Sequence, residues 1–270
     1  KIMDTTSGIN TPYYLYDLDL LRQTLDQARQ AASLYGYHIH YAIKANHNPI
    51  VTGIINDYKF GVDCVSGNEV MEALHRGFPS EKIVYAGVGK SDDEIRQALE
   101  NDIFCFNVES IEELQVIDEI ASKMKRPARV ALRVNPGVHA HTHKYITTGM
   151  DENKFGIHPS QLQEALDLSN NSKWLDFMGL HFHIGSQITS MQPFAELCLR
   201  VNQIWEEFDI SSMNARILNL GGGLGVHYED PENNPIPDFQ SFFNVIAEKL
   251  KITDSVKVHF ELGRSLVAQC

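Results

Sequence analysis

Cysteine is scarce in this sequence. Only four cysteines occur in 270 residues, and they stand far apart, as Cys64, Cys105, Cys198 and Cys270. No two of them form a CxxC pair, and none has the spacing to histidine that a zinc site needs. The sequence therefore predicts neither a disulfide framework nor a structural zinc site, and we expect reduced thiols.

Basic residues and long apolar runs are also lacking. The chain has 23 Lys and Arg against 35 Asp and Glu, which gives a formal charge of -12. Such a balance argues against nucleic acid or an anionic membrane surface as a partner. No apolar run reaches the length of a membrane span, and residues 1–11 are polar, without the apolar core of a signal peptide. We expect a cytoplasmic enzyme or binding protein.

Strand-like and helix-like segments alternate along the chain. Hydrophobic residues make up 43% of the sequence, enough to bury the core of one large α/β barrel or of two smaller domains. After an entry segment at 11–16, strands are expected at 38–45, 60–65, 82–88, 103–108, 128–135, 177–184, 215–220 and 256–261. Helices are expected at 18–35, 49–56, 68–76, 91–100, 161–168, 192–208 and 239–250, and from 110 after the fourth strand.

This repeat of about 20 to 25 residues is typical of a (β/α)8 TIM-type barrel, in which the helix before the first strand takes the eighth place. An open doubly wound sheet is the alternative fold, although no break in the pattern marks its switch point. We expect a lead-in at residues 1–11 and one barrel domain at 12–270. The connection 137–159 is long for a barrel, and long ordered loops are usually functional.

Lys44 stands at the carboxyl end of the first expected strand, within the segment YAIKAN at 41–46. Active sites of parallel barrels lie at this edge of the sheet. A lysine that faces such a crevice loses hydration, which lowers its pKa and favours Schiff-base chemistry with a carbonyl. Taken alone, the residue is also compatible with a solvated surface charge.

The ends of strands six to eight carry further candidates. His181 and His183, in HFHIGS at 181–186, share one face of a strand, so they suit either a metal pair or packing against a planar ring. The run NLGGGLG at 219–225 provides four glycines whose amides can wrap a phosphate. In ELGR at 261–264, Arg264 is suited to binding an anion with two hydrogen bonds. Asp63 and Arg133 add charged groups to the same rim.

Four of these motifs occur together in an order and spacing that resemble the fold-type III pyridoxal-phosphate decarboxylases. They are YAIKAN, HFHIGS, the triple glycine at 221–223 and ELGR, and NKFGI at 153–157 is similar as well. The resemblance extends from Thr11 to Cys270. It implies an alanine racemase-like barrel as the N-terminal domain of a longer homodimeric enzyme.

The resemblance also implies roles for single residues. Lys44 would bind pyridoxal 5'-phosphate as a Schiff base, His183 would stack on its ring, and Glu261 would pair with its pyridine nitrogen. A carboxylate there favours the protonated ring that accepts electrons during decarboxylation, whereas the alanine racemases place an arginine at this position. The phosphate would be held by Ser186, Gly221, Gly222, Gly223, Gly263 and Arg264. Asp63 and Arg133 would line the cofactor pocket, and Arg264 would also contact a substrate carboxylate.

The implied reaction is decarboxylation of the D-centre of meso-2,6-diaminopimelate to L-lysine and carbon dioxide. Ornithine or arginine as substrate, a metallohydrolase that uses His181 and His183, and a non-catalytic pyridoxal-phosphate-binding protein are the alternatives. Two departures from the family are visible. The family has Glu-Pro-Gly-Arg where this chain has ELGR, and it continues into a β-rich second domain, with a cysteine acid that Cys270 does not match. We therefore expect this chain to lack that domain, to bind the cofactor and to turn over poorly.

Overall fold

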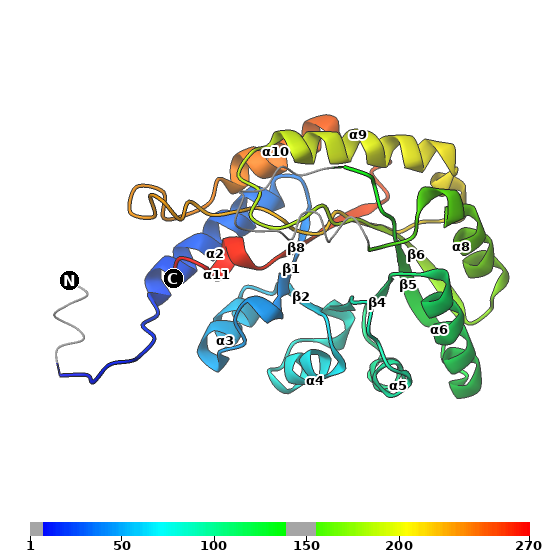
Figure 1. Ribbon diagram of the computed structural model, residues 1–270, viewed down its shortest axis with the longest axis horizontal. Coiled ribbons are helices and arrows are strands. Elements are labelled where there is room, and N and C mark those ends of the chain that lie inside the picture. Colours follow the sequence, from blue (N-terminus) through cyan, green and yellow to red (C-terminus); the bar gives the residue numbers. More distant parts are fainter. Residues whose placement is uncertain (1–7, 139–154) are drawn as a thin grey trace.

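The computed structural model describes residues 8–138 and 155–270, and within them the strands form a closed barrel (Figure 1). Every neighbouring pair is parallel, and β8 returns to pair with β1. The predicted (β/α)8 barrel is therefore confirmed, and the open sheet is excluded. The strands are β1 (His38–Ala42), β2 (Gly61–Cys64), β3 (Ile83–Tyr85), β4 (Cys105–Val108), β5 (Ala128–Arg133), β6 (Leu175–His181), β7 (Ile217–Asn219) and β8 (Lys257–Leu262).

Helices surround the strands, and most begin at a polar cap. Asp17 accepts hydrogen bonds from two amides at the start of the first helix, and Ser91 forms a complete capping box with Glu94. The α-helices are α2 (Leu18–Ser33), α3 (Pro49–Asp57), α4 (Gly67–His75), α5 (Asp92–Glu100), α6 (Ile111–Met124), α8 (Pro159–Asn171), α9 (Gln192–Glu207), α10 (Phe239–Lys249) and α11 (Arg264–Val267). Short 3-10 helices are η1 (Ile43–Ala45), η2 (Ser80–Lys82) and η4 (Ile210–Met213).

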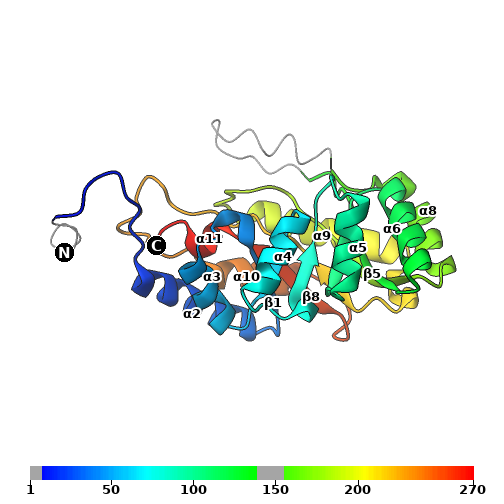
Figure 2. The same ribbon diagram turned by 90° about the horizontal axis from the view of Figure 1, so that it is seen from below.

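The ring of helices is closed by α2, which packs between α10 and α3. This helix precedes the first strand and takes the eighth place, as the repeat predicts. Residues 8–17 lead away from the barrel beyond it (Figure 2). Within the described ranges, every helix is too short or too polar to cross a membrane.

Several expected boundaries are wrong. The first strand ends at Ala42 rather than at residue 45, so Lys44 lies in the 3-10 turn η1, while residues 11–16, expected as a short strand or an entry segment, are irregular. The short helix α11 was not predicted. Asn153 and Lys154 of the NKFGI motif lie outside the described residues, as do residues 1–7 of the expected lead-in.

Alternation along each strand separates the barrel interior from the layer under the helices. In β8, Val258, Phe260 and Leu262 belong to the main core with the helices. Their neighbours face the interior instead, where His259 bonds to His40 on the adjacent β1 and Glu261 accepts from Asn107 on β4 across the barrel. A second apolar cluster fills the middle of the interior on β3 to β7: Val84, Cys105, Ala131, Met178 and Ile217. The interior is thus apolar in its middle and polar toward both ends.

A bulge in β6 decides which way His181 points. The pairing with β5 skips one residue, from Phe177 to Gly179. Gly179 has a φ of 152°, and a Cβ there would lie 1.8 Å from the Ile217 carbonyl oxygen, so only glycine fits. Because the extra residue shifts the alternation by one, His181 and not Leu180 faces the interior.

Candidate active site

A cavity of about 710 Å³ opens at the carboxyl ends of the strands. Nine of the eleven site residues expected from the sequence line it: Lys44, Asp63, Arg133, His183, Ser186, Gly223, Glu261, Gly263 and Arg264. Gly221 and Gly222 are buried beneath it and are not among its lining residues. Ser66, which follows the second strand, caps α4 and is not among the lining residues. The barrel therefore gathers most of the candidates around one space, although they are far apart in sequence.

Lys44 reaches this cavity from the turn η1. The turn is held by the Tyr41 hydroxyl, which donates to the Asn46 carbonyl oxygen at 2.8 Å. Lys44 itself is exposed, so the burial that was expected to strip its hydration is not found. The reason is that the strand ends two residues earlier, which places the side chain at the mouth of the cavity rather than inside the barrel.

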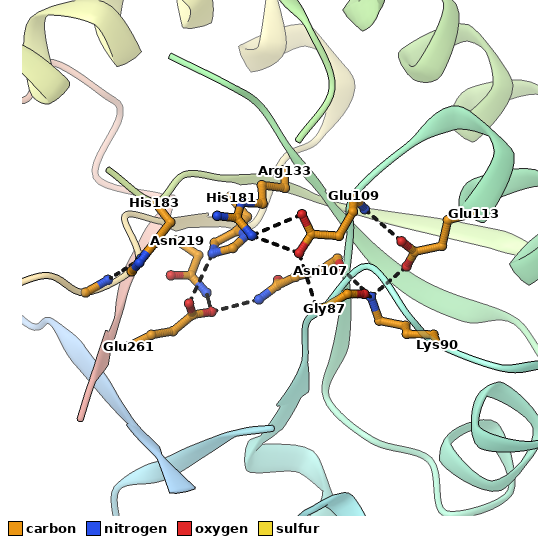
Figure 3. Close-up of polar contacts among 11 residues, drawn as sticks. Gly87, Lys90, Asn107, Glu109, Glu113, Arg133, His181, His183, Asn219 and Glu261 are labelled. Carbon is orange, nitrogen blue, oxygen red and sulfur yellow. Dashed lines mark hydrogen bonds and ion pairs between the residues drawn. The ribbon is translucent and has the colours of Figure 1, made fainter. Parts of the chain in front are cut away.

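Glu261 lies deep in the cavity and is almost fully buried. Its Oε1 accepts hydrogen bonds of 2.7 Å from the side-chain amides of Asn107 and Asn219, and its Oε2 lies 3.1 Å from His181 Nε2 (Figure 3). Burial raises the pKa of Glu261, but His181 and these hydrogen bonds outweigh it, so that the pKa falls below its usual range. The arrangement keeps Glu261 as a carboxylate.

Asp63 is a second buried carboxyl group in the same cavity, with the opposite behaviour. Burial and the charge of Glu261 raise its pKa well above the usual range, against the smaller effects of Lys44 and Arg133. Its Oδ1 is buried and has no hydrogen-bond partner among the described residues. A buried carboxyl oxygen without a partner is costly, so this atom is suited to receive a donor from a ligand.

The glycine turn after β7 is packed tightly against the neighbouring strands. Gly221 has a φ of 68° and donates its amide to Asn219 Oδ1 at 2.9 Å, while the Gly222 amide donates to His183 Nδ1 at 3.2 Å. A Cβ at Gly222 would lie 1.9 Å from the Glu261 carbonyl oxygen. The first two glycines thus allow close contact between strands, whereas Gly223 alone faces the cavity.

Two arginines lie on the walls. Arg264 donates to the Tyr228 hydroxyl, while its buried Nε has no partner among residues 8–138 and 155–270. Arg133 Nη1 lies 2.9 and 3.0 Å from the two carboxylate oxygens of Glu109, and its guanidinium lies 5.6 Å from the centre of the Phe155 ring. Arg264 is therefore the guanidinium better placed to receive an anion.

A buried ion pair supports the side of the cavity that carries Arg133 and Glu109. Lys90 Nζ lies 2.7 Å from Glu113 Oε1, and it also donates to the carbonyl oxygens of Gly87 and Asn107 (Figure 3). Glu113 Oε2 accepts from the Glu109 amide at 3.0 Å. Ser110 caps α6 by accepting from the Glu113 amide, but the Glu113 side chain does not return to the Ser110 amide, because it turns toward Lys90 and the Glu109 amide. Lys90 ties the end of β4, with Asn107 and Glu109, to the loop after β3.

Sequence reasoning missed the residues that orient Glu261 and Arg133. Asn107 and Asn219 sit at matching inward positions near the ends of β4 and β7, and Glu109 follows β4 directly. Reading each strand with a period of two would have found the two asparagines. The sequence analysis did not place His181 beside Glu261, because the bulge that turns it there leaves no mark in the pattern beyond one glycine.

The structure gives no support to the metal alternative. His181 Nε2 is engaged with Glu261, and His183 Nδ1 with the Gly222 amide. In the part of the chain that the structure describes, no group of three or more His, Cys, Asp or Glu side chains is arranged to hold a metal ion.

Known proteins match this chain over nearly its whole length. Diaminopimelate decarboxylase of Bacteroides thetaiotaomicron is 48% identical over 269 residues, which cover 99% of this chain and 70% of the relative. Diaminopimelate decarboxylase of Aquifex aeolicus is 37% identical over 268 residues, 99% of this chain and 62% of the relative. The chain therefore spans roughly two thirds of the length of these relatives.

A solved structure is also similar to this chain over nearly its whole length. The crystal structure of diaminopimelate decarboxylase from Helicobacter pylori, complexed with L-lysine, superposes with a TM-score of 0.90 at 35% identity, and covers 99% of this chain and 67% of that one. The family model for the pyridoxal-binding domain of pyridoxal-dependent decarboxylases matches residues 19–268. Since the match takes in every strand and the whole cavity, this chain belongs to the pyridoxal-dependent decarboxylase family and carries its pyridoxal-binding domain.

Proposed function

We propose that this domain binds pyridoxal 5'-phosphate and serves a carboxy-lyase that converts meso-2,6-diaminopimelate to L-lysine and carbon dioxide. One observation carries the proposal: Lys44, Glu261 and Arg264 line a single cavity of about 710 Å³, although they come from opposite ends of the sequence. The names of the relatives support the substrate, and the L-lysine in the Helicobacter pylori structure is the product that this reaction would release.

The groups present fit the cofactor. Among the described residues, the backbone amides of Gly223 and Arg264 have no hydrogen-bond acceptor, and neither does the buried Nε of Arg264. Donors of this kind are what a phosphate group requires. Glu261, kept ionised, matches a protonated ring nitrogen, and the unpartnered Asp63 Oδ1 can accept from a polar group of the ligand.

Each residue then has a task that its position allows. Lys44, exposed at the mouth, would present its amine to the aldehyde end of the cofactor. When bound, pyridoxal phosphate supplies a conjugated ring that takes up the electron pair left by the departing carboxylate. Glu261 would keep a proton on the ring nitrogen, His183 would contact the ring, and Gly223, Ser186, Gly263 and Arg264 would hold the phosphate. Gly221 and Gly222 support that site from below, and Arg133 lines the pocket.

The first experiment locates the cofactor. The purified protein is loaded with pyridoxal phosphate, reduced with borohydride and digested, and the labelled peptide is sequenced. We expect the label on Lys44 and its absence in Lys44→Ala, with Lys59→Ala, an exposed lysine outside the cavity, as the matched control. A label on another lysine, or undiminished label in Lys44→Ala, would refute the assignment.

A second experiment addresses the substrate and the whole protein. Carbon dioxide release is measured from meso-diaminopimelate, ornithine and arginine, for this chain and for the Bacteroides thetaiotaomicron relative. Because part of each relative has no counterpart in the match, we expect the relative to prefer meso-diaminopimelate and this chain to load cofactor but turn over slowly. We propose that the active enzyme is a homodimer, to be checked by analytical ultracentrifugation. Faster release from ornithine or arginine would replace the substrate assignment.

A further inference from the structure

A second cavity, of about 630 Å³, opens at the other end of the barrel. Its lining includes the first residues of several strands, among them His38 of β1, Gly61 of β2 and Lys257 of β8. Because all strands are parallel, the amino-terminal ends lie on the face opposite Lys44. Nothing in the proposed reaction uses this space.

Positive charge gathers around this second cavity in a protein whose net charge is -12. Its basic lining residues are Arg29, Lys59, Lys82, Arg216 and Lys257, against Glu81 as the acidic one. Asp26 and Asp176 pair with the two arginines. Within the described ranges no carboxylate pairs with any of the three lysines, and the Lys82 ammonium donates only to the Lys59 carbonyl oxygen, at 2.8 Å.

The lysines occupy an arc rather than a point. Lys257 begins β8, Lys59 precedes β2 and Lys82 precedes β3, and these strands follow one another in the ring around β1. Cations at the starts of three different strands suit a ligand whose negative charges are spread along one molecule, such as a compound with several carboxylates. The lysines also affect His38. Burial lowers the pKa of His38, and the positive charges of Lys257 and Lys82 lower it further.

Two hydrogen-bonded histidines, His40 and His259, line this cavity. His40 Nδ1 lies 3.2 Å from the Lys82 carbonyl oxygen, and His40 Nε2 lies 2.8 Å from His259 Nδ1. A carbonyl oxygen only accepts, so His40 carries its proton on Nδ1 and its Nε2 accepts from His259 Nδ1. His259 Nε2 is then an acceptor, and it is buried with no partner among the described residues. Burial lowers the pKa of both rings, that of His40 to about 4, so both are neutral.

We propose that this second cavity binds a small hydroxylated polycarboxylate. Lys59, Lys82 and Lys257 hold the separated carboxylates, and His259 Nε2 accepts a hydrogen bond from the hydroxyl group. The hydroxyl satisfies the one acceptor that the two histidines leave open, and a site built to accept from a hydroxyl strongly rejects an analogue that lacks it.

Citrate is the probe, and tricarballylate, which differs only by lacking the hydroxyl, is its matched control. Binding is followed by calorimetry at constant ionic strength, and located by the imidazole NMR signals of His38, His259 and His183. We expect saturable citrate binding that perturbs His38 and His259, with tricarballylate at least tenfold weaker. Equal binding of the two anions, no saturation, or perturbation confined to His183 in the opposite cavity would overturn the proposal.

Variants test the charged groups. Lys59 and Lys257 are exposed, so Lys59→Gln and Lys257→Gln should leave the fold intact. We expect each to weaken citrate binding at least fivefold. Lys123→Gln makes the same change of charge on an exposed helix surface outside the cavity, and should bind citrate as the unaltered protein does. Arg264→Gln removes a guanidinium from the opposite cavity and should also leave citrate binding unchanged. Unaltered binding in both cavity variants, or loss in Arg264→Gln, would contradict the site.

Discussion

Glu261 and Asp63 lie in the same cavity, but the pKa values of their carboxyl groups shift in opposite directions. Three hydrogen-bond partners surround Glu261 and hold its pKa below the usual range. Asp63 is equally buried, but one of its oxygens has no partner and its pKa is raised. Both side chains are almost fully enclosed, so the difference follows from the neighbouring charges and hydrogen bonds: His181 and the asparagines favour the Glu261 carboxylate, whereas the charge of Glu261 disfavours that of Asp63.

Glu261→Gln should therefore affect both reaction and stability. Loss of a preorganised charge next to the reacting group typically costs about 10²-fold or more in rate, and we expect decarboxylation to fall by that order. The carboxylate stabilises the folded state at pH values above the usual glutamate pKa of 4.5, and this contribution is lost as the pH falls below it. Denaturation from pH 7 to pH 3 should thus show a deficit in the variant that shrinks on acidification. An unchanged rate would contradict the role.

Asp63→Asn should have the opposite effect on stability. The raised pKa means that the charged form is unfavourable in the folded state at neutral pH, and the penalty fades as the pH falls toward 3.8. We expect the melting temperature of the variant to rise by a few degrees at pH 7 and to approach that of the unaltered protein in acid. Asp254→Asn, at an exposed position, is the control and should change little. Destabilisation at pH 7 would show that Asp63 has a partner that stabilises its charge.

Turns and pairs between elements fix the walls of the cavity. The glycine turn brings β7 against β8 so closely that Gly222 has no room for a side chain. We expect Gly222→Ala to cost about 1–3 kcal/mol of unfolding free energy and to weaken cofactor loading, because the turn must move from Glu261. Gly53→Ala, in α3 and with open space around its Cα, should be neutral or slightly stabilising. Equal stability of the two variants in urea would refute this account.

The buried Lys90–Glu113 ion pair stabilises another side of the cavity, at the ends of β3 and β4. Burial raises the pKa of Glu113 and Lys90 lowers it, so removal of the lysine leaves an uncompensated buried carboxyl group. Lys90→Met should cost about 3–5 kcal/mol. Adding Glu113→Leu should restore part of that loss, since both charges are then gone. Urea denaturation of the single and double variants measures the coupling, and additive losses would contradict it.

The order of strands and helices could be predicted from the sequence, because hydrophobic period and capping residues are local properties. Asn48 before Pro49 and Ser91 before Glu94 both begin helices where expected. The sequence motifs also indicated nine residues that line the cavity. What could not be predicted depends on contacts across the barrel: the bulge at Gly179, the early end of β1 at Ala42, and the asparagines that bind Glu261.

At the scale of the whole molecule, the seam between β1 and β8 joins the two ends of the fold. His40 pairs in register with Glu261, and the helix that completes the outer ring is the first in the chain. Lys44 therefore follows the end of β1 on one side of the seam, and Arg264 follows the end of β8 on the other side. During synthesis Lys44 leaves the ribosome long before Arg264. A partly made barrel therefore lacks one of the two groups proposed to hold the cofactor. If the domain binds pyridoxal phosphate as proposed, cofactor loading should occur only after β8 has paired with β1, and it should therefore report on completed folding.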